Sequence, residues 1–141
     1  MAILVTSGTG AAAFRVERLL QTREKVIFGD HEGFPLPAFP AGKFIRIPGG
    51  KSNTFIHDLL DLCLDLGITE VYALRRDELT PLAEGKQLFL EFGIHVFVPS
   101  TEILQMRLLA GPVPGNDIQI RENGLFVQDA STGDYSVFTA D

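Results

Sequence analysis

The stretch Ile3-Leu4-Val5-Thr6-Ser7-Gly8-Thr9-Gly10 decides the fold of this chain. It starts as a short, unbroken apolar run and ends in a turn that holds two glycines. After the turn, from about Ala11 to Thr22, apolar residues recur at helical spacing. The residues on the apolar face of this helical segment are Ala12, Val16, Leu19 and Leu20. A strand, a glycine-rich turn and a helix in this order are typical of the first unit of a parallel α/β domain.

Four more apolar runs continue the pattern and predict the other strands of the same sheet. They are Lys25–Asp30, Lys43–Ile47, Glu70–Leu74 and His95–Val98. Because these runs are apolar on both faces and helical segments separate most of them, we expect a parallel sheet that is covered on both sides. The predicted fold is therefore α/β, a Rossmann-like three-layer sandwich with a five-stranded parallel sheet.

Three further helical segments are expected along the chain. The first covers Thr54–Leu66 and carries Cys63 on its apolar face. The second is expected to begin at Pro81, because the first position of a helix does not need the N–H that proline lacks. This second helix is expected to bury Leu82, Phe89 and Phe92. The third is expected to follow a Ser100 cap and to end near Leu109.

The last 30 or so residues differ in character from the rest. A Gly- and Pro-rich segment at 111–115 is followed by three short strand patterns, Asp117–Arg121, Leu125–Asp129 and Tyr135–Thr139. Asn123-Gly124 is a strong hairpin signal between the first two. We therefore expect one domain at 1–110 and a small antiparallel β meander at 111–141 that is not an independent domain. The meander is expected to cover an edge of the main sheet or, as we favour, to pair with a second copy in a homodimer.

Composition and charge exclude several classes of function. The chain has 141 residues and a formal net charge of -6, and its lysines and arginines form no cluster, which argues against nucleic acid or an anionic membrane as a partner. No apolar run approaches the roughly 18 residues of a membrane-spanning helix, and the N-terminus lacks the basic region of a signal peptide. The single Cys63 cannot form an internal disulfide, so we expect a cytoplasmic protein. The three histidines are widely spaced, and we expect no metal site.

The glycine-rich turn matches part of a dinucleotide-binding fingerprint. Gly8-x-Gly10-x-x-Ala13 follows a predicted strand and opens a predicted helix, whose N-terminus offers free N–H groups to a phosphate. Asp30 lies 20 residues after Gly10, at the spacing of the acidic residue that binds a ribose hydroxyl. One interpretation is therefore an NAD(P)-binding protein, either a small oxidoreductase or a sensor. The other is a tight strand–helix turn that binds nothing.

The serial order of the segments resembles the pre-ATP-grasp domain, the N-terminal lobe of ATP-grasp ligases such as the carbamoyl-phosphate synthase large subunit. The resemblance covers about residues 2–110 and rests on Ile3–Gly10, Val26–Asp30, Phe44–Pro48, Ile68–Leu74, Asp77–Ala83 and Phe92–Ser100. It implies a lobe that contributes part of an acceptor-substrate site, while ATP, magnesium and the phosphoryl chemistry belong to later lobes. Those lobes have no counterpart in this sequence. We therefore expect a stand-alone lobe or a fragment that is not a complete enzyme, and that binds a small acceptor-type ligand or a partner ATP-grasp protein.

The candidate binding residues follow the predicted strands at their carboxyl ends, where parallel sheets bind ligands. They are Ser7, Gly8, Thr9, Gly10, Asp30, His31, Arg75, Arg76, Asp77 and Glu78. The two arginines have the chemistry to hold a carboxylate or a phosphate. No residue is assigned a catalytic role, and a short-chain dehydrogenase is disfavoured because the chain has no Tyr-x-x-x-Lys pair.

Overall fold

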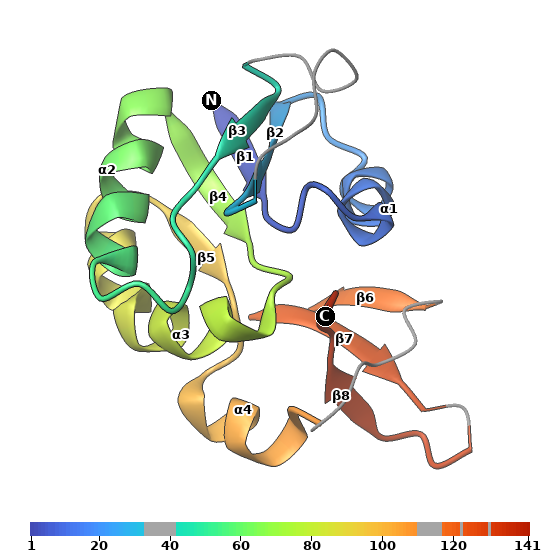
Figure 1. Ribbon diagram of the computed structural model, residues 1–141. Helices are drawn as coiled ribbons and strands as arrows, with labels where there is room; N and C mark the ends of the chain where they lie inside the picture. The colour runs from blue at the N-terminus through green and yellow to red at the C-terminus, as the bar shows by residue number, and fades with distance from the viewer. Residues whose placement is uncertain (33–41, 110–116, 122, 130) are drawn as a thin grey trace.

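The main sheet has the predicted parallel architecture. The computed structural model describes residues 1–32, 42–109, 117–121, 123–129 and 131–141 (Figure 1). The sheet holds β1 (Ala2–Val5), β2 (Lys25–Asp30), β3 (Phe44–Arg46), β4 (Ile68–Tyr72) and β5 (His95–Phe97). All neighbours pair in parallel, in the order β3-β2-β1-β4-β5. This confirms the predicted α/β fold.

Helices cover both faces of this sheet. They are α1 (Ala11–Leu20), α2 (Phe55–Leu66), α3 (Arg76–Glu91) and α4 (Thr101–Arg107). In Figure 1, α2 and α3 lie on the left of the sheet and α1 on the right. Alternate strand residues point to opposite faces, so Leu4 and Val71 pack on the α2–α3 side, whereas Val5 and Tyr72 pack on the α1 side. Within the described part of the chain, no helix combines the length and the apolar composition that a membrane span requires.

The C-terminal residues form a small antiparallel sheet, as predicted. It consists of β6 (Ile118–Arg121), β7 (Gly124–Gln128) and β8 (Tyr135–Val137), in the order β6-β7-β8. The meander lies beneath the strand ends in Figure 1, and its Ile118, Leu125 and Phe138 are buried in the cluster on the α1 side of the main sheet. The described residues thus place it over the chain's own sheet. Pairing with a second copy stays a prediction, and the predicted breaker at 111–115 lies outside the described residues.

The prediction that a helix begins at Pro81 is wrong, because the helix in question, α3, begins at Arg76 and holds Pro81 inside it. Arg75 is the N-cap, and the Glu78 side chain accepts a hydrogen bond from the backbone N–H of Arg75, with Asp77 and Glu78 as acidic residues in the first turn. These carboxylates favour the positive end of the helix dipole. Pro81 costs the helix one hydrogen bond, since it has no N–H for the carbonyl of Asp77.

Two side chains expected in the core are exposed. Leu19 is 46% exposed and Phe92 is 52% exposed. The buried stripe of α1 is narrow and consists of Ala12, Ala13 and Val16. Phe92 is the C-cap of α3 and is followed by Gly93 at a φ of 78°, so it lies in the turn that ends the helix before the chain returns to the core at Ile94.

Candidate functional site

An ion pair joins the ends of two strands that flank β1. Asp30 ends β2 and has no exposed surface, and Arg75 follows β4 as the N-cap of α3. The Nε of Arg75 donates to Oδ1 of Asp30 at 2.9 Å, and Nη2 donates to Oδ2 at 2.9 Å. This two-point geometry is the strongest arrangement open to a guanidinium and a carboxylate. The pair therefore links two of the candidate residues in a defined geometry.

The glycine-rich turn adds further donors to Asp30. Thr9 donates to Oδ2 from its backbone N–H at 3.2 Å and from its hydroxyl at 2.6 Å. Burial by itself raises the pKa of Asp30, but the hydrogen bonds from Arg75 and Thr9 outweigh burial and hold the pKa below its ordinary value. Asp30 is thus ionised at neutral pH. In the dinucleotide interpretation a ribose hydroxyl would have to share this carboxylate with Thr9 and Arg75.

A second carboxyl group, that of Glu78, lies fully buried at the same edge of the sheet. The Thr6 hydroxyl donates to its Oε1 at 2.7 Å and accepts from the backbone N–H of Leu74 at 2.8 Å. Burial raises the pKa of Glu78 to about 7, in spite of the hydrogen bonds from Thr6 and Arg75 and with a further contribution from the charge of Asp77. This carboxyl group therefore titrates near neutral pH.

Three buried polar atoms near these residues have no hydrogen-bond partner in the described part of the chain. They are Nδ1 of His31, Oδ1 of Asp77 and Oε2 of Glu78. A buried acceptor or donor without a partner costs about 1–3 kcal/mol, so native structures hold few of them. His31 follows β2, and Asp77 and Glu78 follow β4, so all three atoms lie near the carboxyl edge of the sheet. This region therefore has unmet hydrogen-bonding capacity.

The turn between β1 and α1 is tight, and two backbone hydrogen bonds hold it. The N–H of Gly8 donates to the carbonyl of Gly29, and the N–H of Gly10 donates to the carbonyl of Ser7. Ser7 itself has a φ of 56°, which residues other than glycine seldom adopt. A Cβ at Gly10 would meet only Ser7 atoms, none closer than 3.6 Å, and the φ of Gly10 is -107°. Neither the backbone nor the packing therefore requires a glycine at position 10.

The structure places Arg76 away from the Asp30–Arg75 pair. Its guanidinium donates to the carbonyl of Leu109 and to the hydroxyl of Thr139, at 3.4 Å for the latter. Its backbone N–H donates to Oδ1 of Asp141 at 2.8 Å. Arg76 therefore contacts the C-terminal segment 139–141, whereas the neighbouring Arg75 contacts the end of β2.

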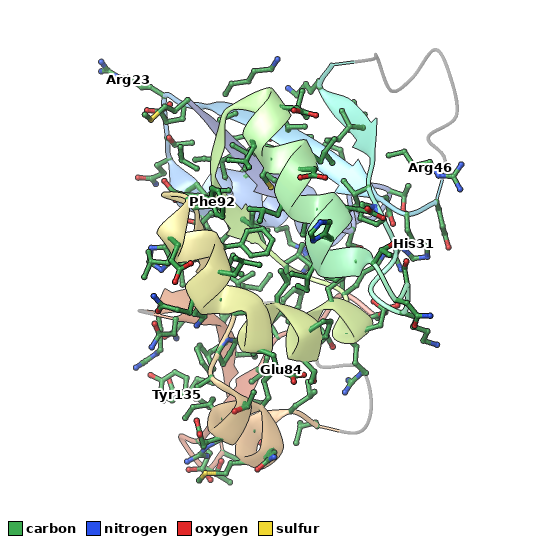
Figure 2. All side chains as sticks on the ribbon, turned by 90° about the vertical axis from the view of Figure 1, so that its left-hand side faces the viewer. Arg23, His31, Arg46, Glu84, Phe92 and Tyr135 are labelled. Atoms are coloured by element: carbon green, nitrogen blue, oxygen red, sulfur yellow. The ribbon has the colours of Figure 1, made fainter. Side chains whose placement is uncertain are left out.

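Thr6 and Gly50 belong to this region and were missed from the sequence. Thr6 directly follows β1, so its place at the strand end was a usable signal. Gly50 lies in the loop after β3, where a Cβ would lie 2.4 Å from the carbonyl oxygen of Asp77. The neighbouring Gly49 packs on His31, which Figure 2 labels beside this loop. Nothing local in the sequence indicates that this loop packs on the first turn of α3.

We use the name carboxyl-edge site for the residues that are linked by these contacts. It consists of Thr6, Thr9, Asp30, Arg75, Asp77 and Glu78. Within the described residues no group of three His, Cys, Asp or Glu side chains is arranged to hold a metal ion. Cys63 is buried in the core, and burial raises its pKa to about 12, so it is not an activated nucleophile. The groups at this edge offer ionic and hydrogen-bonding interactions to a ligand.

Comparison with known proteins assigns no family to this chain. No protein-family model matches it, and no curated protein matches it.

Proposed function

We propose that this chain is a binding lobe of the pre-ATP-grasp kind, which holds a small acceptor-type ligand at the carboxyl-edge site. It performs no catalysis by itself. ATP and magnesium would act only where a partner ATP-grasp protein supplies the lobes that bind them.

One observation carries this proposal. Buried polar atoms of Asp77 and Glu78 that have no partner among the described residues lie at the carboxyl edge of a parallel sheet, which is where such sheets bind ligands. The Asp30–Arg75 pair at the same edge is also bonded to Thr9. A pair that is already ordered adds no entropic cost of its own to binding.

The test is a thermal-shift screen of the purified chain, followed by calorimetric titration of each compound that stabilises it. The screen contains amino acids, small carboxylates, ATP with magnesium, and NAD(P) in both redox states. A ligand at a hundred times its Kd stabilises the fold by about 2.7 kcal/mol, which such a screen detects. We expect stabilisation by an amino acid or carboxylate and none by ATP with magnesium. Hydrolysis of ATP by the chain alone, stimulated by a small acceptor, would contradict the proposal.

A second candidate function, dinucleotide binding, is favoured by Gly10. This glycine opens α1 at a position where the fold accepts a side chain, so its small size serves close approach of a ligand in this interpretation. The four hydrogen bonds already accepted by Asp30 weigh against it. NAD(P) stabilising the wild type but not Gly10→Val would establish this second function in place of the first.

A further inference from the structure

We propose that the ligand of the carboxyl-edge site carries a protonated amine, and that the carboxyl groups of Glu78 and Asp77 recognise it. This inference rests on the ligand-binding function proposed above and names the chemical class of the ligand.

The unmet hydrogen-bonding capacity of Glu78 and Asp77 is of one kind. Oε2 of Glu78 and Oδ1 of Asp77 are buried, and neither has a partner in the described part of the chain. An ionised carboxylate only accepts hydrogen bonds, so above about pH 7, where Glu78 is mostly ionised, its missing partner is a donor. Oε1 of Glu78 already accepts from Thr6, which leaves Oε2 as the free acceptor of a side chain with no exposed surface.

The charges at the site favour a cationic donor over a neutral one. The charge of Asp30 is compensated by Arg75 through two hydrogen bonds. Asp77 is close enough to Glu78 for its charge to raise the pKa of Glu78, whereas the charge of Arg75 lowers it. An ammonium group supplies three donors and one positive charge, and so relieves both the repulsion and the missing hydrogen bonds.

An amine reaches Oε2 of Glu78 only when a neighbouring segment moves, because the side chain is fully buried. Gly50, in the loop after β3, packs directly on the first turn of α3, against the backbone of Asp77 and Glu78. The neighbouring Gly49 packs on His31, which follows β2. We therefore expect that displacement of Gly50 uncovers the first turn of α3 for the ligand.

The experiment compares compounds that differ only in an amino or a hydroxyl group. The pairs are L-alanine and L-lactate, L-aspartate and L-malate, and ethanolamine and ethylene glycol, each titrated calorimetrically at pH 8. We expect the amino member of at least one pair to bind roughly tenfold or more tightly than its hydroxyl partner, as expected for a charge-assisted hydrogen bond in a buried site. Glu78→Gln should bring this ratio close to one. Glu84→Gln, the same change at an exposed position of α3 that Figure 2 labels, should preserve it.

A second measurement uses only the wild type and so does not depend on the folding of a variant. The pKa of Glu78 is about 7, so its carboxyl is mostly protonated at pH 6 and mostly ionised at pH 8. The preference for the amino compound should therefore shrink as the pH falls from 8 to 6, while the affinity of the hydroxyl compound stays constant.

The outcomes separate the two proposals. Equal binding of both members of every pair that binds, unchanged by Glu78→Gln, would overturn amine recognition and leave the binding function standing. Absence of binding by all six compounds would overturn both proposals. Stabilisation by Mg²⁺ alone, lost in Glu78→Gln, would replace the amine with a metal ion and overturn the inference.

Discussion

Thr6 and Glu78 lie 72 positions apart in the chain, and the Thr6 hydroxyl donates a 2.7 Å hydrogen bond to the Glu78 carboxyl inside the core. The same hydroxyl accepts from the backbone N–H of Leu74. One small side chain thus connects the ends of β1 and β4 to the first turn of α3. Both residues are fully buried, so water does not compete for these hydrogen bonds.

Replacement of Thr6 by valine should destabilise the fold with little change in side-chain volume. The N–H of Leu74 would lose its acceptor and Oε1 of Glu78 its Thr6 donor, and we expect a loss of about 1–3 kcal/mol in the free energy of unfolding. Urea denaturation at pH 8 measures it. Thr69→Val serves as the control, because the Thr69 hydroxyl makes a long, 3.5 Å contact to the carbonyl of Ala2. Equal stability of the Thr6 and Thr69 variants would show that the Thr6 network contributes nothing.

The contribution of Glu78 to the free energy of unfolding should fall as the pH rises from 4.5 to 7. Its pKa is about 7 in the folded chain against 4.5 for the free side chain, so the folded state binds the extra proton in this range. A difference of this size corresponds to about 3 kcal/mol. Burial is the main cause, and the charges that face the group are those of Asp77 and Arg75.

Glu78→Gln isolates this contribution, because glutamine has nearly the same shape and no titrating proton. The stability of the variant relative to the wild type should increase between pH 4.5 and 7 and stay constant above pH 8. Urea denaturation at a series of pH values checks it, with Glu84→Gln as the exposed control on the same helix. A difference between Glu78→Gln and the wild type that does not vary with pH would mean that Glu78 has an ordinary pKa.

Two glycine-to-alanine changes should have opposite effects on stability. A Cβ at Gly50 would lie 2.4 Å from the carbonyl oxygen of Asp77, so the backbone must shift, at a cost of about 1–3 kcal/mol. A Cβ at Gly10 meets only ordinary contacts, and alanine there should be neutral or should stabilise by up to about 1 kcal/mol. Thermal and urea denaturation of both variants measure the difference. Comparable losses in both would mean that the β1–α1 turn requires its glycine for structural reasons.

The Asp30–Arg75 pair should behave as a coupled unit. Arg75→Met leaves a fully buried carboxylate without its cation, and we expect a loss of about 3–5 kcal/mol. Asp30→Asn should also be destabilising, but the double variant should lose much less than the two single losses together, since no uncompensated charge remains. A double-mutant cycle by urea denaturation gives the coupling. Additive losses would mean that the two side chains do not depend on each other.

The positions of β1 and β2 follow from the sequence because each is a short apolar run that is buried on both faces. β2 has the bounds expected, and the Ser100 cap before α4 is confirmed by a hydrogen bond from the backbone N–H of Ile103 to the Ser100 hydroxyl. The predicted start of α3 is wrong because Pro81 is a strong local signal for the first position of a helix. The true start depends on Glu78, whose capping role is visible only when Asp77 and Glu78 are already placed in the first turn.

The interactions that shape the candidate site are less accessible from sequence, because they join distant segments. Asp30 and Arg75 were both expected at the carboxyl edge, yet no local pattern indicates that they bond to each other across 45 positions. The packing of Gly50 on Asp77 and the burial of Glu78 likewise depend on how the β3–α2 loop and α3 meet in three dimensions. Arg76 directly follows Arg75 in the chain. Because successive residues of a helix point in different directions around its axis, Arg76 contacts the C-terminal segment instead of Asp30.

The contact between Arg76 and Asp141 spans 65 positions, and the backbone N–H of Ala140 donates to the carbonyl of Leu74. During synthesis on the ribosome, β1, β2 and β4 therefore emerge well before the residues that close the β4–α3 junction. A nascent chain that has just released α3 lacks the contacts of Arg76 with Thr139 and Asp141 and the bond between Leu74 and Ala140, which form only when the meander has been translated. The β4–α3 junction would then be completed late, after most of the parallel sheet has already had time to form.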